Sequence, residues 1–337
     1  MNMNAMTLAS KSHGRWLEMS NVPSGEPGEG EVLIRIDVCG VCRTDLHIVE
    51  GNLSLAGPGL IPGHEIVGTV VKTGEHVHSL RPGDTVGVPW LHGTCGVCEF
   101  CASGRENLCR RKTFTGYTVN GGFAEYVIAR EAFSIPIGRG MSPVQTAPLL
   151  CSGIIGYRAF KLARPPPGGI LGIFGFGGSA HITLQIALAL GYDVRVTTRN
   201  ERHLELAMQL GATRAIGPHR ADAAAAKGSL DAAIVFAPSG LVVRSALESV
   251  GPGGIVAVPA IHMDAISLPD YELHLFHEKK LFSVEANTRA DALEFMKLAA
   301  RVGVRSVVKE FRLEDANTAL SQLKAGEING SAVLRIT

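Results

Sequence analysis

The sequence predicts an α/β protein in two parts, a β-rich part followed by a doubly wound parallel sheet covered by helices. Short apolar segments broken by glycine and proline fill residues 31–137, which is typical of strands joined by tight turns. From about residue 153, apolar strands alternate with helix-sized segments, which is the pattern of βαβ units. At 337 residues, 46% of them hydrophobic, the chain is long enough to form two cores.

The expected elements follow this division. The first part has strands at 32–38, 65–71 and 85–88. The second part has strands at 169–174, 194–198, 232–236 and 254–258, with helices at 179–190 and 201–210. A helix over 313–324 and a strand over 332–336 end the chain.

The charge balance favours a small-molecule partner. The chain has 32 Lys and Arg against 31 Asp and Glu, a formal charge of +1, so it has no global positive field that would attract nucleic acid or an anionic membrane. It also lacks an apolar run near the roughly 18 residues of a membrane helix, and its first residues lack the apolar core of a signal peptide. We therefore expect a soluble, cytoplasmic protein that binds neither nucleic acid nor membrane.

Four of the seven cysteines form the strongest single motif in the chain. Cys95, Cys98, Cys101 and Cys109 have the spacing C-x2-C-x2-C-x7-C. Four thiolates in one loop predict a closed, structural zinc site with no position for water. An iron–sulfur cluster, whose usual spacings agree only in part, and a loop of unrelated thiols are the alternatives.

The other three cysteines suggest a second metal site. Cys39 and Cys42 precede a Gly-His-Glu run that contains His64, and Cys151 lies where the β-rich part ends. Two thiolates and one imidazole form the Cys2His set of a catalytic zinc, which leaves the fourth position open. On their own, Cys39 and Cys42 could equally be a redox pair, and His64 a buried core histidine.

A glycine-rich loop predicts a dinucleotide site. It follows the apolar strand at 169–174, opens a helix, and has Ala in place of the third glycine of the fingerprint. Such a loop turns sharply and presents helix N-terminal N–H groups to a pyrophosphate, although a turn of this kind can also occur without a ligand. The residues assigned to it are Gly175, Gly177, Gly178, Ser179 and Ala180.

The end of the next strand favours NADP over NAD. NAD sites place an acid there for the ribose, whereas this chain has Thr198 and Arg199, which can donate to a 2′-phosphate. Asp193 lies at the other end of the strand, so we assign it to the surface. A solvated charge at a helix start is the alternative for Arg199.

These motifs together resemble those of zinc-dependent medium-chain alcohol dehydrogenases over essentially the whole chain. The matching stretches are GVCRTDLH, PGHEIVG, CGVCEFC with its later cysteine, GGFAEYV, LLCSGIIGYRAF and the glycine loop. The resemblance implies a GroES-like catalytic domain over residues 1–150, completed by 287–337, and a Rossmann dinucleotide-binding domain over 151–286. It also implies hydride transfer between NADP, or alternatively NAD, and a primary or secondary alcohol, with the aldehyde or ketone as product, in a homo-oligomer.

The same resemblance assigns roles at the two zincs expected per chain. The catalytic zinc ligands are Cys42, His64 and Cys151, which leaves Cys39 as an ordinary buried thiol. Asp45 orients the ligand imidazole and Glu65 lies behind the metal, with helix capping or a surface charge as their alternatives. The remaining assignments are a proton path through Thr44, the nicotinamide ribose and His47, a pyrophosphate contact by Arg43, and substrate-pocket positions near Trp90, Leu91, Ile48 and Val49.

The assignments of Thr44 and Arg43 have plain alternatives, a strand-end hydroxyl and a surface charge. Two alternatives concern the whole protein. One is a zinc-free quinone or enone reductase of the same superfamily, which would lack the metal ligands. The other is a non-catalytic zinc-ribbon module that binds phosphates through Arg105, Arg110, Arg111 and Lys112. Metal content separates them, because the dehydrogenase holds two zincs and the ribbon alone holds one.

Overall fold

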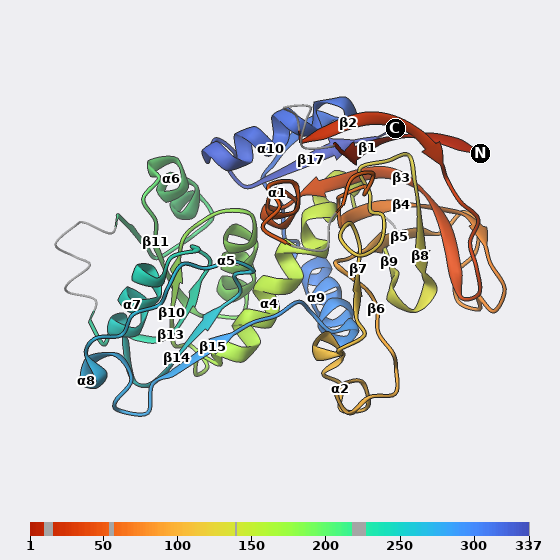
Figure 1. The fold of residues 1–337 in the computed structure, drawn as a ribbon. Coiled ribbons are helices and arrows are strands. Elements are labelled where there is room, and N and C mark those ends of the chain that lie inside the picture. Colours follow the sequence, from red (N-terminus) through yellow and green to blue (C-terminus); the bar gives the residue numbers. More distant parts are fainter. Residues whose placement is uncertain (10–15, 54–56, 139, 218–226, 337) are drawn as a thin grey trace. The chain divides into compact units, whose positions relative to one another are not determined.

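The chain folds into two compact units (Figure 1). The computed structural model describes residues 1–9, 16–53, 57–138, 140–217 and 227–336. The first unit comprises Met1–Cys151, Ala286–Glu294 and Ser306–Thr337, and the second comprises Ser152–Glu285 and Phe295–Arg305.

The first unit is built on a seven-stranded sheet of order β16-β17-β3-β4-β5-β9, with β8 also paired to β3. All its pairs are antiparallel except β16 with β17. Its strands are β3 (Glu31–Val41), β4 (Glu65–Thr73), β5 (Thr85–Val88), β8 (Tyr126–Arg130), β9 (Ile135–Pro136), β16 (Val308–Arg312) and β17 (Ser331–Arg335). Two further antiparallel pairs are β1 (Asn2–Leu8) with β2 (Leu17–Pro23) and β6 (Leu91–Gly93) with β7 (Thr113–Phe114). Its helices are α1 (Arg43–Val49), α2 (Glu99–Ala102), α3 (Pro143–Thr146) and α10 (Ala316–Ala325).

Apolar alternation accounts for the core of this unit. Val32, Ile34 and Ile36 of β3 are fully buried, whereas Arg35 between them is exposed. The same core includes Phe123 and residues of β1, β4, β17 and α10. β3 is the central strand, and its C-terminal end leads directly into α1.

The second unit is a six-stranded parallel sheet with helices between its strands. Its order β12-β11-β10-β13-β14-β15 is that of the Rossmann fold, whose ligands bind at the carboxyl ends of the strands. The strands are β10 (Ile170–Phe174), β11 (Asp193–Thr197), β12 (Arg214–Ile216), β13 (Leu230–Val235), β14 (Val250–Val258) and β15 (Lys280–Ser283). The helices are α4 (Ser152–Ala163), α5 (Gly178–Ala189), α6 (Glu201–Gln209), α7 (Gly240–Ser249), α8 (Tyr271–His274) and α9 (Arg289–Val302), whose first residues belong to the first unit.

The structure differs from the sequence-based expectation at three places. Residues 295–305 group with the second unit instead of the first, because the buried Phe295 packs against Tyr157, with ring centroids 5.7 Å apart. The two end residues of the expected 151–286 domain, Cys151 and Ala286, both group with the first unit. The helix expected over 313–324 begins with a 3₁₀ turn, Leu313–Asp315, so α10 starts only at Ala316. Among the described residues, no helix combines the length and the apolar character needed to cross a bilayer.

Candidate active site

Cys42, His64 and Cys151 lie together in the first unit. Cys42 is the residue between β3 and α1, His64 immediately precedes β4, and Cys151 follows a 3₁₀ turn, Ala147–Leu150. Because β3 and β4 pair with Gly40 opposite Glu65, the first two residues come from neighbouring strand ends. One ligand atom from each of the three lies within 4.8 Å of the others.

The imidazole of His64 is fixed from one side only. Its Nδ1 lies 3.0 Å from Oδ1 of Asp45, and both side chains are fully buried. Its Nε2 is buried and has no hydrogen-bond partner among the described residues. A buried polar atom without a partner is costly, and a metal ion held with Cys42 and Cys151 would satisfy it.

Asp45 organises the backbone around this histidine. Its Oδ2 accepts the N–H of Cys42 at 2.8 Å, and its Oδ1 also accepts the N–H of Gly63 at 3.1 Å. Asp45 is the third residue of α1, so it caps the helix as well as contacting the imidazole. The two interpretations of Asp45 that the sequence left open therefore describe the same side chain.

Burial, hydrogen bonds and neighbouring charges shift the pKa values of the three residues in this cluster. The hydrogen bond with Cys151 lowers the pKa of the Cys42 thiol well below its ordinary value, and it raises the pKa of Cys151 well above. Burial opposes the charged form of His64, but the Asp45 carboxylate outweighs it and raises the pKa of His64 well above its ordinary value. The cluster thus favours a thiolate at Cys42, which is the form that binds metal.

Glu65 and Cys39 lie beside this cluster. A Cβ at Gly40 would lie 1.9 Å from the Glu65 carboxylate, so that carboxylate packs against the bare backbone of β3. Cys39 is fully buried and donates to the carbonyl of Gly40 at 3.5 Å. Burial raises the pKa of the Cys39 thiol well above its ordinary value, and the residue is in neither metal-ligating group. The structure therefore groups Cys42, and not Cys39, with His64.

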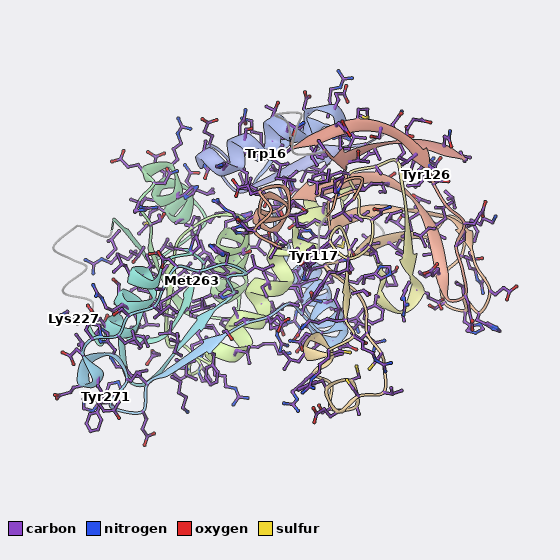
Figure 2. The ribbon with its side chains drawn as sticks, viewed as in Figure 1. Trp16, Tyr117, Tyr126, Lys227, Met263 and Tyr271 are labelled. Carbon is purple, nitrogen blue, oxygen red and sulfur yellow. The ribbon has the colours of Figure 1, made fainter. Side chains whose placement is uncertain are left out.

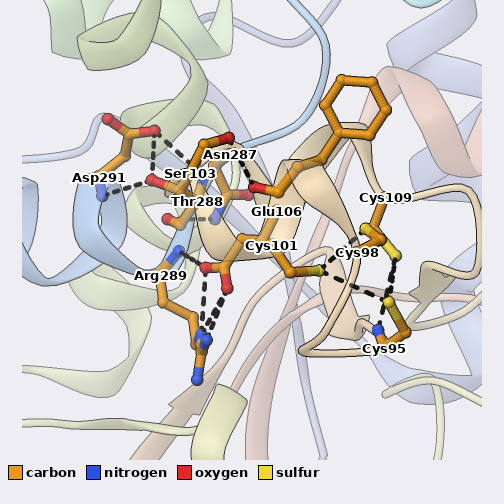
Figure 3. A network of polar contacts seen from close by, with 11 residues as sticks. Cys95, Cys98, Cys101, Ser103, Glu106, Cys109, Asn287, Thr288, Arg289 and Asp291 are labelled. Carbon is orange, nitrogen blue, oxygen red and sulfur yellow. Dashed lines mark hydrogen bonds and ion pairs between the residues drawn. The ribbon is translucent and has the colours of Figure 1, made fainter.

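The four remaining cysteines form a second cluster around α2 (Figure 3). Their sulfurs lie within 4.8 Å of one another, and the shortest contacts are 3.6 Å, between Cys98 and Cys101 and between Cys109 and Cys95. Backbone N–H groups of Val97 and Cys98 lower the pKa of Cys95 to about 5. Four sulfurs at this spacing, all as free thiols, fit a tetrahedral ion with no open position.

The glycine loop connects β10 to α5 in the second unit. Gly175 has φ +84°, and a Cβ there would lie 2.9 Å from the backbone nitrogen of Ala237. Gly177 has open space where a Cβ would point, and Gly178 begins α5. Ser179 is half-buried in the first turn, and Ala180 is fully buried. The loop thus leaves the first N–H groups of a twelve-residue helix free to meet a phosphate.

Thr198 and Arg199 follow the carboxyl end of β11. Thr198 is 8% exposed, and its N–H donates to the carbonyl of Ile216 at 3.2 Å. Arg199 is exposed. Asp193 lies at the opposite end of β11, where it pairs with Arg195 at 3.3 Å. The acid is thus separated from the ligand-binding edge by the whole strand.

The relay candidates lie on α1. The hydroxyl oxygen of Thr44 lies 3.8 Å from the sulfur of Cys42, and Thr44 lies in the first turn of α1, not at a strand end. His47 is 9% exposed, and its Nδ1 lies 3.2 Å from the amide nitrogen of Asn52, a contact that the sequence did not indicate. Arg43 is the exposed first residue of the helix.

Three aromatic rings extend from His64. Trp90 meets the His64 ring edge-on, with centroids 4.8 Å apart, and it stacks on Phe114 at 4.6 Å and on Tyr117 at 5.9 Å. Figure 2 labels Tyr117 in this part of the first unit. Phe114 and Tyr117 lie only 6.4 Å apart, so both cover the same face of the indole. Leu91 and Ile48, which the family resemblance also suggested for the pocket, are each 1% exposed and pack in the interior.

A Rossmann-type sheet with a glycine loop and two groups of residues that could hold a metal ion are the features of a zinc-containing dehydrogenase that uses a nicotinamide nucleotide. Residues 28–139 match the model of the alcohol dehydrogenase GroES-like domain, and residues 178–301 match that of the zinc-binding dehydrogenase. The probable alcohol dehydrogenase AdhA of Mycobacterium tuberculosis is 46% identical over 92% of this chain and 90% of its own length. An alcohol dehydrogenase of Geobacillus stearothermophilus is 37% identical over 95% of this chain and 96% of its own length.

Solved structures agree with these relatives. A cinnamyl alcohol dehydrogenase of Sorghum bicolor has a TM-score of 0.91 at 26% identity and covers 99% of this chain and 98% of its own. An acetophenone reductase of Geotrichum candidum, solved with NAD, has a TM-score of 0.87 at 28% identity and covers 99% and 97%. The chain belongs to the zinc-dependent medium-chain alcohol dehydrogenase family, and it is an NAD(P)-dependent alcohol dehydrogenase.

Proposed function

We propose that this dehydrogenase depends on two zincs per chain, a catalytic zinc at Cys42, His64 and Cys151 and a structural zinc at the four-cysteine cluster. The observation that carries the proposal is the buried Nε2 of His64, which has no hydrogen-bond partner among the described residues and belongs to the same ligand group as the two thiols. Three protein ligands leave one position open for substrate, whereas four sulfurs close the other site.

The residues around the catalytic site have distinct tasks in the proposed reaction. A bound zinc supplies Lewis acidity that lowers the pKa of an alcohol hydroxyl. Asp45 holds the His64 imidazole in place through its Nδ1. The Thr44 hydroxyl, next to Cys42, would accept the substrate proton as it gives up its own, and His47, three residues further along α1, would exchange a proton with solvent. Glu65 would add negative charge close to Cys151 in this ligand group.

The cofactor proposed for the second unit is NADP. Gly175, Gly177 and the start of α5 would bind the pyrophosphate, and the pyrophosphate contact that the family resemblance gives Arg43 stays a prediction. Thr198 and Arg199 meet the 2′-phosphate, because no carboxylate stands at the carboxyl end of β11 to repel it. NAD is the alternative cofactor, because the acetophenone reductase of Geotrichum candidum, which is 28% identical, was solved with NAD.

The substrate class proposed is alcohols with a flat apolar group, with the corresponding aldehydes or ketones in the reverse direction. Trp90 lies against His64 and is held on one face by Phe114 and Tyr117, so it forms a rigid aromatic wall beside the metal ligands. Planar groups gain from stacking on such a wall. The similar structure from Sorghum bicolor is named a cinnamyl alcohol dehydrogenase, and the one from Geotrichum candidum is named an acetophenone reductase.

A homo-oligomer is proposed from the edge of the second unit's sheet. β15 is the last strand of that sheet, and its Phe282 side chain is 44% exposed. An exposed edge strand with an apolar side chain is a surface for pairing with a second copy. Light scattering coupled to size-exclusion chromatography tests it, and a monomer at micromolar concentration contradicts it. Cytoplasmic localisation stays a prediction.

The experiment that tests the function is a metal count combined with a substrate panel. The purified protein is analysed for zinc, and ethanol, 1-butanol, benzyl alcohol and cinnamyl alcohol are assayed with both cofactors. Two zincs per chain with turnover of the aromatic alcohols support the proposal. One zinc per chain, or equal turnover by a zinc-free protein, contradicts the two-zinc proposal.

A further inference from the structure

Glu106 connects the four-cysteine loop to a helix that begins 183 residues later (Figure 3). It lies in a 3₁₀ turn, Glu106–Leu108, between Cys101 and Cys109, and its side chain is 8% exposed. Its carboxylate accepts the backbone N–H of Arg289 at 2.7 Å and Nη2 of the same residue at 2.6 Å. The Nε of Arg289 adds contacts of 3.1 and 3.0 Å to the two carboxylate oxygens.

These contacts place the carboxylate at the start of α9. Arg289 is the first residue of this helix, so its N–H has no partner within the helix. Thr288 and Asp291 hydrogen-bond each other at 2.8 and 3.1 Å, which completes the local part of the cap. The negative charge of Glu106 also faces the positive end of the helix dipole. The cap of α9 therefore has one part made locally and one part supplied by the cysteine loop.

The geometry separates this pair from an ordinary surface ion pair. An exposed pair contributes little, but here the acid is buried and the guanidinium binds it with two of its nitrogens. The guanidinium carbon also lies 4.7 Å from the centroid of the Phe133 ring, which restricts its orientation. Removing one partner would leave the other in a partly dehydrated place without its counter-charge.

The turn that carries Glu106 ends at a zinc ligand. The N–H of Cys109 donates to the carbonyl of Glu106 at 3.0 Å, and Cys109 is fully buried. An ion held by Cys109 and the other three sulfurs would fix this turn, and the turn in turn fixes Arg289.

We propose that Glu106 is a positioning residue that couples zinc retention by the four-cysteine loop to the order of the first turn of α9. The coupling is reciprocal, as for any two events linked through one structure: zinc loading orders the turn, and the ordered turn slows zinc loss. The proposal rests on the structural zinc proposed above, and it adds a function for Glu106 and Arg289 that is independent of the reaction.

The test compares Glu106→Gln with Glu99→Gln. Glu99 is an exposed acid in the same loop, so its substitution removes the same charge without touching Arg289. Zinc release to an excess of a chromogenic chelator is followed in both variants and in the unmodified protein. Hydrogen exchange of peptides covering 286–294 is measured before and after release of the loop zinc. Arg289→Lys, which keeps the charge but loses the planar fork, is the second variant.

The expected result is zinc release from the loop about tenfold faster in Glu106→Gln, with an unchanged rate in Glu99→Gln. The release rate of Arg289→Lys lies between those of the other two variants. Hydrogen exchange at 286–294 rises both in Glu106→Gln and on zinc release. Two outcomes overturn the coupling: an unchanged zinc release rate in Glu106→Gln, or hydrogen exchange at 286–294 that is the same before and after release of the loop zinc. If the loop never binds zinc, the structural zinc of the proposed function is wrong, and the coupling has no basis. A Glu106→Gln chain that does not fold is replaced by Arg289→Lys, which gives the same two readouts.

Discussion

Oδ1 of Asp45 lies 3.0 Å from Nδ1 of His64, and neither side chain is exposed. The same carboxylate accepts the backbone N–H groups of Cys42 and Gly63. One acid therefore fixes the imidazole of the proposed metal ligand and the backbone on both sides of the cluster. Its position at the third residue of α1 makes this possible, because there its side chain folds back over the end of β3.

Replacing Asp45 with Asn weakens this arrangement. An amide has one acceptor oxygen, so at least one of the three donors is left unsatisfied. We expect zinc to leave the catalytic site 10- to 100-fold faster, and unfolding by urea to show a loss of about 1–3 kcal/mol. Asp37→Asn, which removes a carboxylate elsewhere on β3, is the control. Equal zinc release from both variants would contradict the role of Asp45.

Cys42→Ser and Cys39→Ser distinguish the ligand from its neighbour. The first is expected to reduce zinc from two to one per chain and to abolish alcohol turnover, because the open site loses a thiolate. The second is expected to keep two zincs and to cost roughly 1–3 kcal/mol of stability, since a hydroxyl replaces a buried thiol. Zinc analysis and denaturant titration measure both. The opposite pattern would exchange the two assignments.

Arg199→Asp tests the cofactor. The change removes a donor for the 2′-phosphate and adds a carboxylate for the ribose hydroxyl, so kcat/KM for NADPH relative to NADH falls by about 10- to 100-fold. Arg301→Asp makes the same change of charge at an exposed position in the second unit and is expected to leave the ratio unchanged. An unaltered ratio in Arg199→Asp sinks the NADP proposal.

Trp90→Leu tests the aromatic wall. We expect kcat/KM for benzyl alcohol to fall about tenfold more than that for ethanol, since only the larger substrate gains from stacking. Trp16→Leu is the matched control, because Trp16 packs on the core of the same unit and lies against Lys324. Equal losses for both alcohols would mean that Trp90 acts through packing alone.

His181 makes stability depend on pH. Burial lowers the pKa of this α5 residue from 6.5 to about 4, so between these values the unfolded chain binds a proton that the folded chain does not. Its contribution to stability is complete above pH 6.5 and is lost as the pH falls toward 4. Between pH 7 and pH 5, the free energy of unfolding of His181→Leu is expected to fall by about 2 kcal/mol less than that of the unmodified protein. Urea titrations at both values measure this, with the exposed His78→Gln as control.

The sequence was a good guide wherever the signal is local. The C-x2-C-x2-C run, the glycine loop after β10 and most strand positions in both units are found as expected, because each depends on neighbouring residues. The shift of residues 295–305 to the second unit was not predictable, since it depends on the contact of Phe295 with α4. Glu106 and Arg289 were missed for the same reason, because no pattern in the sequence marks a pair separated by 183 positions. Short edge strands such as β12 and β15 carry too few residues to show a period.

Cys39 differs from the other six cysteines in the event that would make its thiol accessible to a reagent. A Cβ at Gly63 or at Gly122 would lie 2.9 Å from its sulfur, so the thiol fills a space that two glycines leave open inside the sheet. The other six thiols all belong to the two proposed ligand sets. An alkylating reagent should therefore modify the chain in two stages, six thiols after metal removal and the seventh only when the sheet itself opens. The mass of the labelled protein would then report loss of metal and loss of fold as separate events.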